Sequence, residues 1–592
     1  EGTPFPLTEV QTAYLVGRTG AYSDGGVGCT GYVEFDLDLA GLGIGDLREP
    51  AERTAVMDRL TQAWDRVCAA HPMLRAVIGS DGTQSVRPGM QVPMQIELDP
   101  DDERGERLRR ELTGRQYRID SERPMMDIIA RITDGGIVVH LSIDLLITDY
   151  AGIRSLLHDF DRALEHPHER IAPPSLSFAA YQRHREARAA TAEARAERER
   201  DRAWWRERMA RAPEPLSFAG ALEEPEEGTV SRRRSHHLPG PSWEAFTAAC
   251  AEHALTPSSV LLALLGAVGR RYGSLEESLV TVTAAQREQL APDMARIVGD
   301  FTTTVLARVR CTHRLLEDAR AAQQEVFAAL EHGSVSGLEA SRMIGPRDGE
   351  GTRRARAVPV VFTSMIGASP LPEPRRLRIR PGSGVSATPQ VLLDVQITPA
   401  GDGVTVDWDS RIGGFDERLL DEAFADYCAA IDALCADKRW PDGPALPQRG
   451  PQPIERVDRG AARLESSIVL HADADPRAVA LICGSERLTR SELMQRANAL
   501  AAGLLRRGLG VGSPVMVRLG PGADQIAAEL GVLLAGGCFV PIDPQWPPAR
   551  TAEIGTALTT AWGTAPLVVD DDCVRAACSP QALAAAGTPP VV

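Results

Sequence analysis

The stretch HLSIDLLITDYAGIRS, residues 140–155, places a strand pattern directly before a helix pattern. Around its start, side chains alternate between two faces as they do along a strand, with Ile137, Val139, Leu141 and Ile143 on one face and Val138, His140, Ser142 and Asp144 on the other. Farther on, apolar residues recur at helical spacing, at Ile153, Leu156, Leu157, Phe160 and Leu164. The stretch therefore predicts a strand, a short connection and a helix.

Two carboxylates, Asp144 and Asp149, lie at this junction. Asp149, or Thr148 before it, lies where a helix N-cap belongs, so a cap or a buried ion-pair partner is the favoured interpretation of Asp149. Asp144 emerges at the end of the strand, where loops often carry functional groups. The position of Asp144 at a strand end is equally compatible with a structural and a functional role.

Strand-like and helix-like segments alternate along the rest of the chain. Strands are predicted in GYVEFDLDL (31–39), GIVVHLSIDLL (136–146) and LRIRPG (377–382), and within 298–310, 357–367 and 387–410. Helices are predicted in AVMDRLTQAWDRVCAAHPML (55–74) and LTPSSVLLALLGAVGRRYG (255–273). The fold class is therefore α/β or α+β.

The chain has 592 residues, which is more than one hydrophobic core usually supports, so several domains are expected. The highly charged segment 185–213 predicts a solvated helix that crosses between two lobes. The proline-rich segment 438–457 marks the next boundary. We expect an N-lobe at 1–180, a C-lobe at 181–445, a linker at 446–465 and a further unit at 466–592.

The composition argues against several classes of protein. A net charge of −16 disfavours nucleic acid as a ligand, and no apolar run is long enough to span a membrane. The ten cysteines form no CxxC pair and no cluster with histidine, which disfavours a disulfide framework or a zinc site. Because the N-terminus also lacks the pattern of a signal peptide, we expect a cytoplasmic protein.

The spacing from Asp144 to Asp149 resembles the D-x-x-x-x-D signature of heterocyclization domains of nonribosomal peptide synthetases, which are relatives of the condensation domains. In condensation domains the equivalent motif is HHxxxDG, and Leu145 stands where its second histidine, the base, would be. A leucine accepts no proton, so condensation through that histidine is disfavoured.

Other motifs follow in the order of that family, and together they cover about residues 3–440. They are FPLTEVQTAYLVGR (5–18), HPMLRAVI (71–78), VGDFTT (298–303), PVVFTS (359–364), TPQVLLDVQ (388–396) and VDWDSRIGGFDERLLDEAFADY (406–427). Two positions depart from the family pattern: Gly152 replaces a frequent serine, and TVTAAQRE (281–288) replaces a motif like LFNR.

The resemblance implies two lobes, each like chloramphenicol acetyltransferase, that form a V with a central tunnel. Carrier proteins would bring both substrates on phosphopantetheine arms, with no cofactor or metal bound directly. Asp394 would shuttle the proton in cyclodehydration, and Thr363 would orient it. Asp149 would hold its loop in shape, with an arginine as its expected partner, while Asp144 would lie nearer the tunnel together with Gln396 and Ser364.

The sequence pattern, taken without the resemblance, supports only part of this assignment of roles. Strand alternation places Leu392, Asp394 and Gln396 on one face, which would let the carboxylate reach a tunnel. Without the resemblance, Thr363 is an ordinary β-branched strand residue, and Asp394 is as compatible with an ion pair at a sheet edge.

The segment 466–592 resembles the start of an adenylation domain, in which LTRSEL (488–493) and LLAGGCFVPIDP (533–544) match the first two core motifs. Such domains need a catalytic lysine, and the only lysine, Lys438, precedes the segment. We therefore expect a truncated adenylation portion that does not activate amino acids.

The expected function is condensation of a carrier-bound acyl or peptidyl donor with a carrier-bound Cys, Ser or Thr, followed by cyclodehydration to a thiazoline or oxazoline. The partners would be donor and acceptor carrier proteins and the synthetase's own adenylation domain. A condensation enzyme without ring closure and a non-catalytic docking module for carrier proteins remain as alternatives.

Overall fold

The computed structural model describes residues 2–19, 26–98, 102–133, 135–218, 231–273, 276–312, 314–344, 358–368, 370–380, 382–436, 440, 446, 464–484 and 486–579. The chain divides into two compact units, of which unit 1 covers residues 1–448 and unit 2 covers residues 449–592. Most of the proline-rich segment, including Lys438, lies outside the described residues.

The first lobe of unit 1 is built on a six-stranded sheet that contains the strand of the opening stretch. The sheet has the order β12-β2-β7-β6-β5, with β13 also pairing with β2; the strands are β2 (Thr30–Leu37), β5 (Gln95–Leu98), β6 (Met126–Thr133), β7 (Gly136–Asp144), β12 (Leu377–Ile379) and β13 (Val385–Ala387). Helices α2 (Pro50–Ala70) and α4 (Tyr150–Glu165) pack against each other and bury Phe35, Val139 and Leu141 of the sheet.

Smaller elements complete this lobe. Helix α3 (Asp102–Thr113) buries Leu108 and Leu112 against Tyr32 and Ile129 of the sheet. Strands β1 (Phe5–Pro6), β3 (Ala76–Ile78) and β4 (Thr83–Val86) form a separate sheet, and α1 (Glu9–Gly17) follows β1. The lobe also has the 3-10 turns η1 (Pro72–Arg75) and η2 (Met294–Arg296).

Strands β12 and β13 come from late in the chain, yet both pair with β2 in antiparallel fashion. Leu377 joins the N-lobe core, as do Met294, Ile297 and Phe301. The expected C-lobe range of 181–445 therefore includes segments that belong to the first lobe. Because segments from the second half of unit 1 form part of the N-lobe, a single boundary near residue 180 does not separate the two lobes.

The second lobe has a six-stranded sheet of order β10-β9-β11-β14-β15-β8, formed by β8 (Ser231–Leu238), β9 (Glu277–Ala285), β10 (Thr302–Arg310), β11 (Val360–Ser364), β14 (Leu393–Ala400) and β15 (Gly403–Arg411). Helices α7 (Gly240–Glu252), α8 (Pro257–Gly273), α9 (Leu315–Glu331), α10 (Gly337–Ser341) and α11 (Glu417–Ala436) accompany it. One face of the sheet, with Leu393, Val395 and Ile397, enters the core of the lobe.

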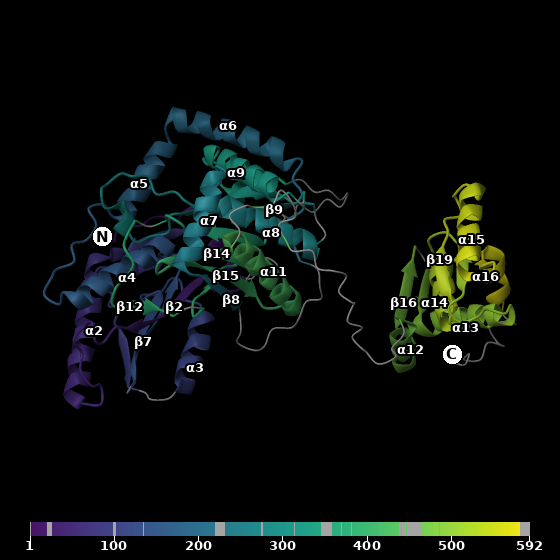
Figure 1. The fold of residues 1–592 in the computed structure, drawn as a ribbon, viewed down its shortest axis with the longest axis horizontal. Coiled ribbons are helices and arrows are strands. Elements are labelled where there is room, and N and C mark those ends of the chain that lie inside the picture. Colours follow the sequence, from purple (N-terminus) through teal and green to yellow (C-terminus); the bar gives the residue numbers. More distant parts are fainter. Residues whose placement is uncertain are drawn as a thin grey trace. The chain divides into compact units, whose positions relative to one another are not determined.

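Two helices join the lobes where the sequence predicted one. Helix α5 (Phe178–Ala189) and helix α6 (Ala192–Met209) follow one another in the chain (Figure 1). Helix α5 places Phe178 and Tyr181 in the N-lobe core, and α6 places Trp205 and Met209 in the C-lobe core. The chain breaks between them because the Thr191 side chain accepts a hydrogen bond from Ala194 N and caps a new helix.

The second unit is a smaller α/β domain with its own core. In the described part of this unit, a parallel sheet of order β19-β18-β20 and the hairpin β16-β17 are accompanied by five helices; the elements are α12 (Leu464–Ala474), β16 (Val479–Cys483), β17 (Glu486–Thr489), α13 (Arg490–Arg506), β18 (Pro514–Val517), α14 (Ala523–Leu534), β19 (Cys538–Pro541), α15 (Pro548–Trp562), β20 (Leu567–Val569) and α16 (Asp571–Ala577).

Across the described residues of both units, no single helix is long and apolar enough to cross a membrane. The bent pair α7 and α8 meets that test only when the two helices are joined.

Candidate functional site

A cavity of about 870 Å³ lies between the two sheets of unit 1. Its N-lobe wall is largely apolar, with Val33, Leu141, Ile143, Leu145 and Ile153 among its residues. Its C-lobe wall is rich in hydroxyl groups because the second face of the C-lobe sheet carries Thr281, Thr283, Thr302, Thr304, Thr363 and Thr398. An acyl group and a polar reacting centre can therefore occupy opposite sides of one space.

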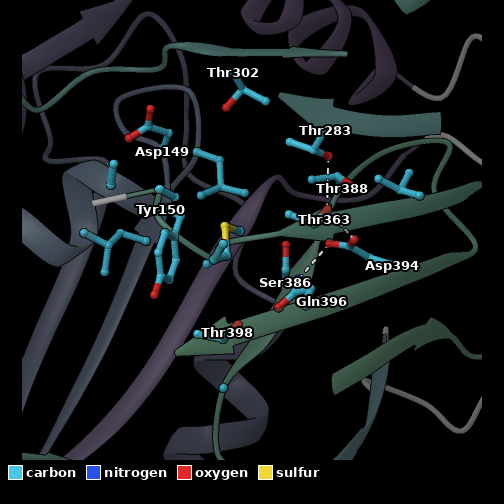
Figure 2. Close-up of a pocket in the computed structure, with 18 of the residues that line it drawn as sticks. Asp149, Tyr150, Thr283, Thr302, Thr363, Ser386, Thr388, Asp394, Gln396 and Thr398 are labelled. Atoms are coloured by element: carbon cyan, nitrogen blue, oxygen red, sulfur yellow. Dashed lines mark hydrogen bonds between the residues drawn. The ribbon is translucent and has the colours of Figure 1, made fainter. Parts of the chain in front are cut away.

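Asp394 lies on the polar wall, and its partners follow from strand register. In the parallel pairing of β11 and β14, Val361 lies opposite Asp394 and Thr363 lies opposite Gln396, so these side chains share one face. The Thr363 hydroxyl donates to Asp394 Oδ1 at 2.7 Å, and Gln396 Nε2 donates to Asp394 Oδ2 at 2.7 Å. Figure 2 shows this group on the two strands, with Asp149 and Tyr150 on the other side of the cavity.

A further hydroxyl extends this chain of hydrogen bonds. The Oγ1 atoms of Thr283 and Thr363 lie 3.0 Å apart (Figure 2). Since Thr363 uses its hydrogen on Asp394, Thr283 is the donor in this pair. The sheet thus presents a continuous line of hydroxyl groups that ends at one carboxylate.

Asp394 has only 9% of its surface exposed, and burial raises its pKa from 3.8 to about 6. The hydrogen bonds from Gln396 and Thr363 favour the charged form and limit the rise, while the nearby Asp409 adds to it. A carboxyl group with this pKa can both accept and return a proton near neutral pH.

Arg233 is a residue of this site that sequence reasoning missed. It lies on β8, and its guanidinium binds Asp409 with two hydrogen bonds of 2.7 and 2.6 Å. Its Nη2 also donates to Gln396 Oε1 at 3.0 Å. The partners are separated from Arg233 by 163 and 176 residues in the sequence, so the only local signal was an arginine within a strand pattern.

Asp149 lies on the opposite wall and has the cap geometry predicted for it. Its Oδ1 accepts from Gly152 N at 2.7 Å at the start of α4. Arg287 Nη2 donates to both carboxylate oxygens at 3.1 Å, and Phe301 N donates to Oδ2 at 3.2 Å. Arg287 belongs to TVTAAQRE (281–288), the segment that departs from the LFNR-like family motif. The segment nevertheless supplies the arginine partner that was expected for Asp149.

Asp144 does not lie nearer the cavity than Asp149, contrary to the expectation. It is fully buried, forms an ion pair with Arg18, and accepts from Leu146 N at 3.0 Å. Burial raises the pKa of Asp144, and Arg18 opposes the rise. Strand β7 ends at Asp144, and the Asp144 side chain binds the backbone of the following turn at Leu146. Leu145, the next residue, lines the cavity.

Ser364 also lines the cavity, and its Oγ lies 2.8 Å from Ser258 Oγ. His236 and His237 lie within β8, and His236 Nε2 lies 2.9 Å from Asp432 Oδ1. In the described residues, no group of three or more His, Cys, Asp or Glu side chains could hold a metal ion.

Two lobes that exchange strands and share a cavity agree with the two-lobed architecture that the resemblance to condensation-type domains implied. Residues 52–338 match the condensation domain family, and residues 470–565 match the AMP-binding enzyme family. Pyochelin synthetase PchE of Pseudomonas aeruginosa is 32% identical over 580 residues, which are 94% of this chain and 38% of that protein. Phenyloxazoline synthase MbtB of Mycobacterium tuberculosis is 31% identical over 579 residues, which are 94% of this chain and 39% of that protein.

Solved structures agree with these relatives. The EpoB cyclization-docking bidomain from Sorangium cellulosum has a TM-score of 0.61 at 26% identity, over 74% of this chain and 85% of that chain. The nonribosomal peptide synthetase FmoA3 has a TM-score of 0.61 at 27% identity, over 100% of this chain and 64% of that chain.

The chain is thus a condensation domain followed by part of an AMP-binding domain, and its relatives are nonribosomal peptide synthetases of the cyclization type. It spans 30% to 38% of the length of the pyochelin synthetases it matches.

Proposed function

We propose that this chain joins a carrier-bound acyl donor to a carrier-bound Cys, Ser or Thr and then closes the product to a thiazoline or oxazoline. The observation that carries the proposal is the buried Asp394, held by Thr363 and Gln396 on the wall of the cavity. Relatives named for pyochelin and for phenyloxazoline support the same class of product.

In the first step, the amine of the acceptor attacks the thioester carbonyl of the donor. A C–N bond forms, the C–S bond breaks, and the donor's thiol leaves on its phosphopantetheine arm. The apolar N-lobe wall accommodates the acyl group and excludes water from the thioester. Leu145 offers no base for this step, so the orientation of the two substrates in the cavity is the main contribution.

In the second step, the side-chain thiol or hydroxyl of the acceptor attacks the new amide carbonyl. A ring C–S or C–O bond forms, and the carbonyl oxygen becomes a hydroxyl group. Asp394 then removes the N–H proton as the C=N bond forms, and returns a proton to the departing hydroxyl, which leaves as water. Thr363 keeps the carboxylate in position for both transfers.

The partners follow from this chemistry. Donor and acceptor carrier domains present both substrates, and phosphopantetheine arms reach the cavity from outside. We assign the second unit to the synthetase's own AMP-binding domain, next to the ring-forming unit in the chain.

The test is to incubate the protein with an acyl carrier thioester and, in separate reactions, with Cys, Ser and Thr carriers, and to measure product masses. The proposal predicts a product lighter by one water than the linear amide with at least one acceptor. Linear amide alone would show a condensation enzyme without ring closure, and binding of carriers without any product would show a docking module. Either result would overturn the proposal.

A further inference from the structure

The polar wall continues behind Asp394 into a group of buried charges. Arg233 Nη1 lies 3.5 Å from Asp407 Oδ2, in addition to its two bonds to Asp409. Ser235 donates to Asp407 at 2.5 Å, and Ser386 N donates to Asp409 at 2.7 Å. One guanidinium thus faces three carboxylates, those of Asp394, Asp407 and Asp409.

We propose that Arg233 is a positioning residue for ring closure, because it fixes the amide of Gln396 so that its NH₂ group always faces Asp394. This inference rests on the proposed function, and it adds Arg233 of β8, which lines the same cavity and acts through Gln396, to the group formed by Asp394 and Thr363.

The argument starts from the donors and acceptors in this chain. A glutamine amide can be reversed at little cost unless its neighbours distinguish oxygen from nitrogen. A guanidinium carries only donors, so the amide atom facing Arg233 must be the oxygen Oε1. Nε2 is thereby directed at Asp394 Oδ2, at 2.7 Å.

The direction of this amide decides which form of Asp394 is favoured. With NH₂ facing it, the carboxylate accepts a charge-assisted hydrogen bond and its ionised form is stabilised. With the amide oxygen facing it instead, only the protonated acid could make the hydrogen bond. Arg233 thus keeps the base ionised at lower pH than burial alone would allow, and its own charge acts in the same direction.

The groups around Asp394 come from several strands. Asp409 of β15 disfavours its ionisation, Arg233 of β8 favours it, and Asp407 of β15 faces Arg233. The neighbouring strands β9 and β11 supply the neutral hydroxyls of Thr283 and Thr363. From α1, Tyr14 adds a phenol that burial keeps neutral, since its pKa is well above 10.

The experiment uses the full chain with Arg233→Met combined with Asp409→Asn, which removes both charges of the ion pair together with the donor to Gln396 Oε1. The ratio of ring to linear amide is measured from pH 5 to pH 9. In the wild type this ratio declines toward acid pH with a midpoint set by the pKa of Asp394. We expect the midpoint of the double variant to lie about one pH unit higher, so that below pH 6 its ratio is about tenfold lower than that of the wild type. Thermal unfolding checks that the variant folds.

The matched control is Arg234→Met combined with Asp421→Asn. Arg234 is the next residue of β8 and points to the other face, where its Nε donates to Asp421 at 2.7 Å. This pair should leave the midpoint of the wild type unchanged. A second test variant, Gln396→Met, removes the amide without touching the ion pair and should also move the midpoint upward.

An unchanged midpoint in Gln396→Met, or in a folded double variant of Arg233 and Asp409, would overturn this inference. The same assay with Asp394→Asn separates it from the proposed function. If Asp394→Asn still forms rings, the assignment of Asp394 fails. If Asp394→Asn forms none while the Arg233 variant keeps the wild-type midpoint, only the role of Arg233 fails.

Discussion

Asp394 illustrates how the surroundings of one carboxylate suit it to the proposed proton transfer. The side chain belongs to a strand whose other face forms the core, so alternation alone brings it to the cavity wall. Burial then shifts its pKa into the range where proton transfer in both directions is effective. The same residue at an exposed sheet edge would remain ionised and serve only as an ion-pair partner.

The pH dependence of ring closure follows from that pKa. Asp394 must be ionised to accept the N–H proton, so ring closure should decline as pH falls through about 6. Amide formation does not use this group and should persist. The ratio of ring to linear amide, measured by mass spectrometry across pH, should therefore fall about tenfold for each pH unit below the midpoint. A ratio independent of pH between 5 and 8 would contradict this role.

The raised pKa also predicts a stability effect. An acid whose pKa is higher in the folded than in the unfolded state destabilises the fold as pH rises from about 4 to about 6. One pKa unit corresponds to about 1.4 kcal/mol, so ionised Asp394 costs up to about 3 kcal/mol at pH 7.

Replacement of Asp394 by Asn removes this cost. The asparagine can accept from Gln396 and donate to Thr363, which can donate in turn to Thr283. We expect the free energy of unfolding to rise at pH 7 but not at pH 4, as measured by denaturant titration. A lower stability at pH 7 would contradict the account.

At the scale of elements, the turn between β7 and α4 is held from both lobes. Asp149 caps α4 in the N-lobe and binds Arg287, while the Arg287 guanidinium lies 3.8 Å from the centre of the Phe301 ring. Arg287 Nη1 also donates to the carbonyls of Met294 and Ile297. The second aspartate of the motif therefore maintains the shape of the cavity wall.

Asp149→Ala should cost about 3 to 5 kcal/mol, because it removes one partner of a buried ion pair together with a helix cap. We expect a lower melting temperature and a loss of linear amide and ring together. The control is Ser177→Ala, which removes only the N-cap bond to Ala180 N and should cost about 1 kcal/mol. Equal effects of the two substitutions would show that the Arg287 pairing contributes nothing.

The sequence predicted local elements well and contacts between distant segments poorly. Alternation correctly gave β7, β14 and the shared face of Asp394 and Gln396, since a strand's period is a local property. The return of β12 and β13 to the N-lobe sheet could not be predicted, because pairing with β2 depends on residues about 340 positions away. Arg233 was missed for the same reason, and the break at Thr191 because a charged helix pattern continues across it.

At the scale of the whole molecule, the cores of the two units are separate. The two large clusters of buried residues lie within residues 5–446, and a third lies within 493–574. The cavity lies within the first unit. The residues assigned to the proposed chemistry therefore all come from the first unit.

A fragment of residues 1–448 should fold and form the same product as the full chain, because each unit encloses its own core. Differential scanning calorimetry of the full chain should show two transitions, of which the fragment keeps one. A fragment that fails to fold, or that folds and forms neither amide nor ring, would contradict independence of the units.

The most direct test of the central claim is the product distribution of Asp394→Asn compared with the wild type, measured by intact mass with an accepted Cys, Ser or Thr carrier. The account predicts that the variant accumulates linear amide while the product lighter by one water is lost by at least a hundredfold, which corresponds to a general acid–base contribution. Wild-type amounts of the cyclised product from the folded variant would contradict it.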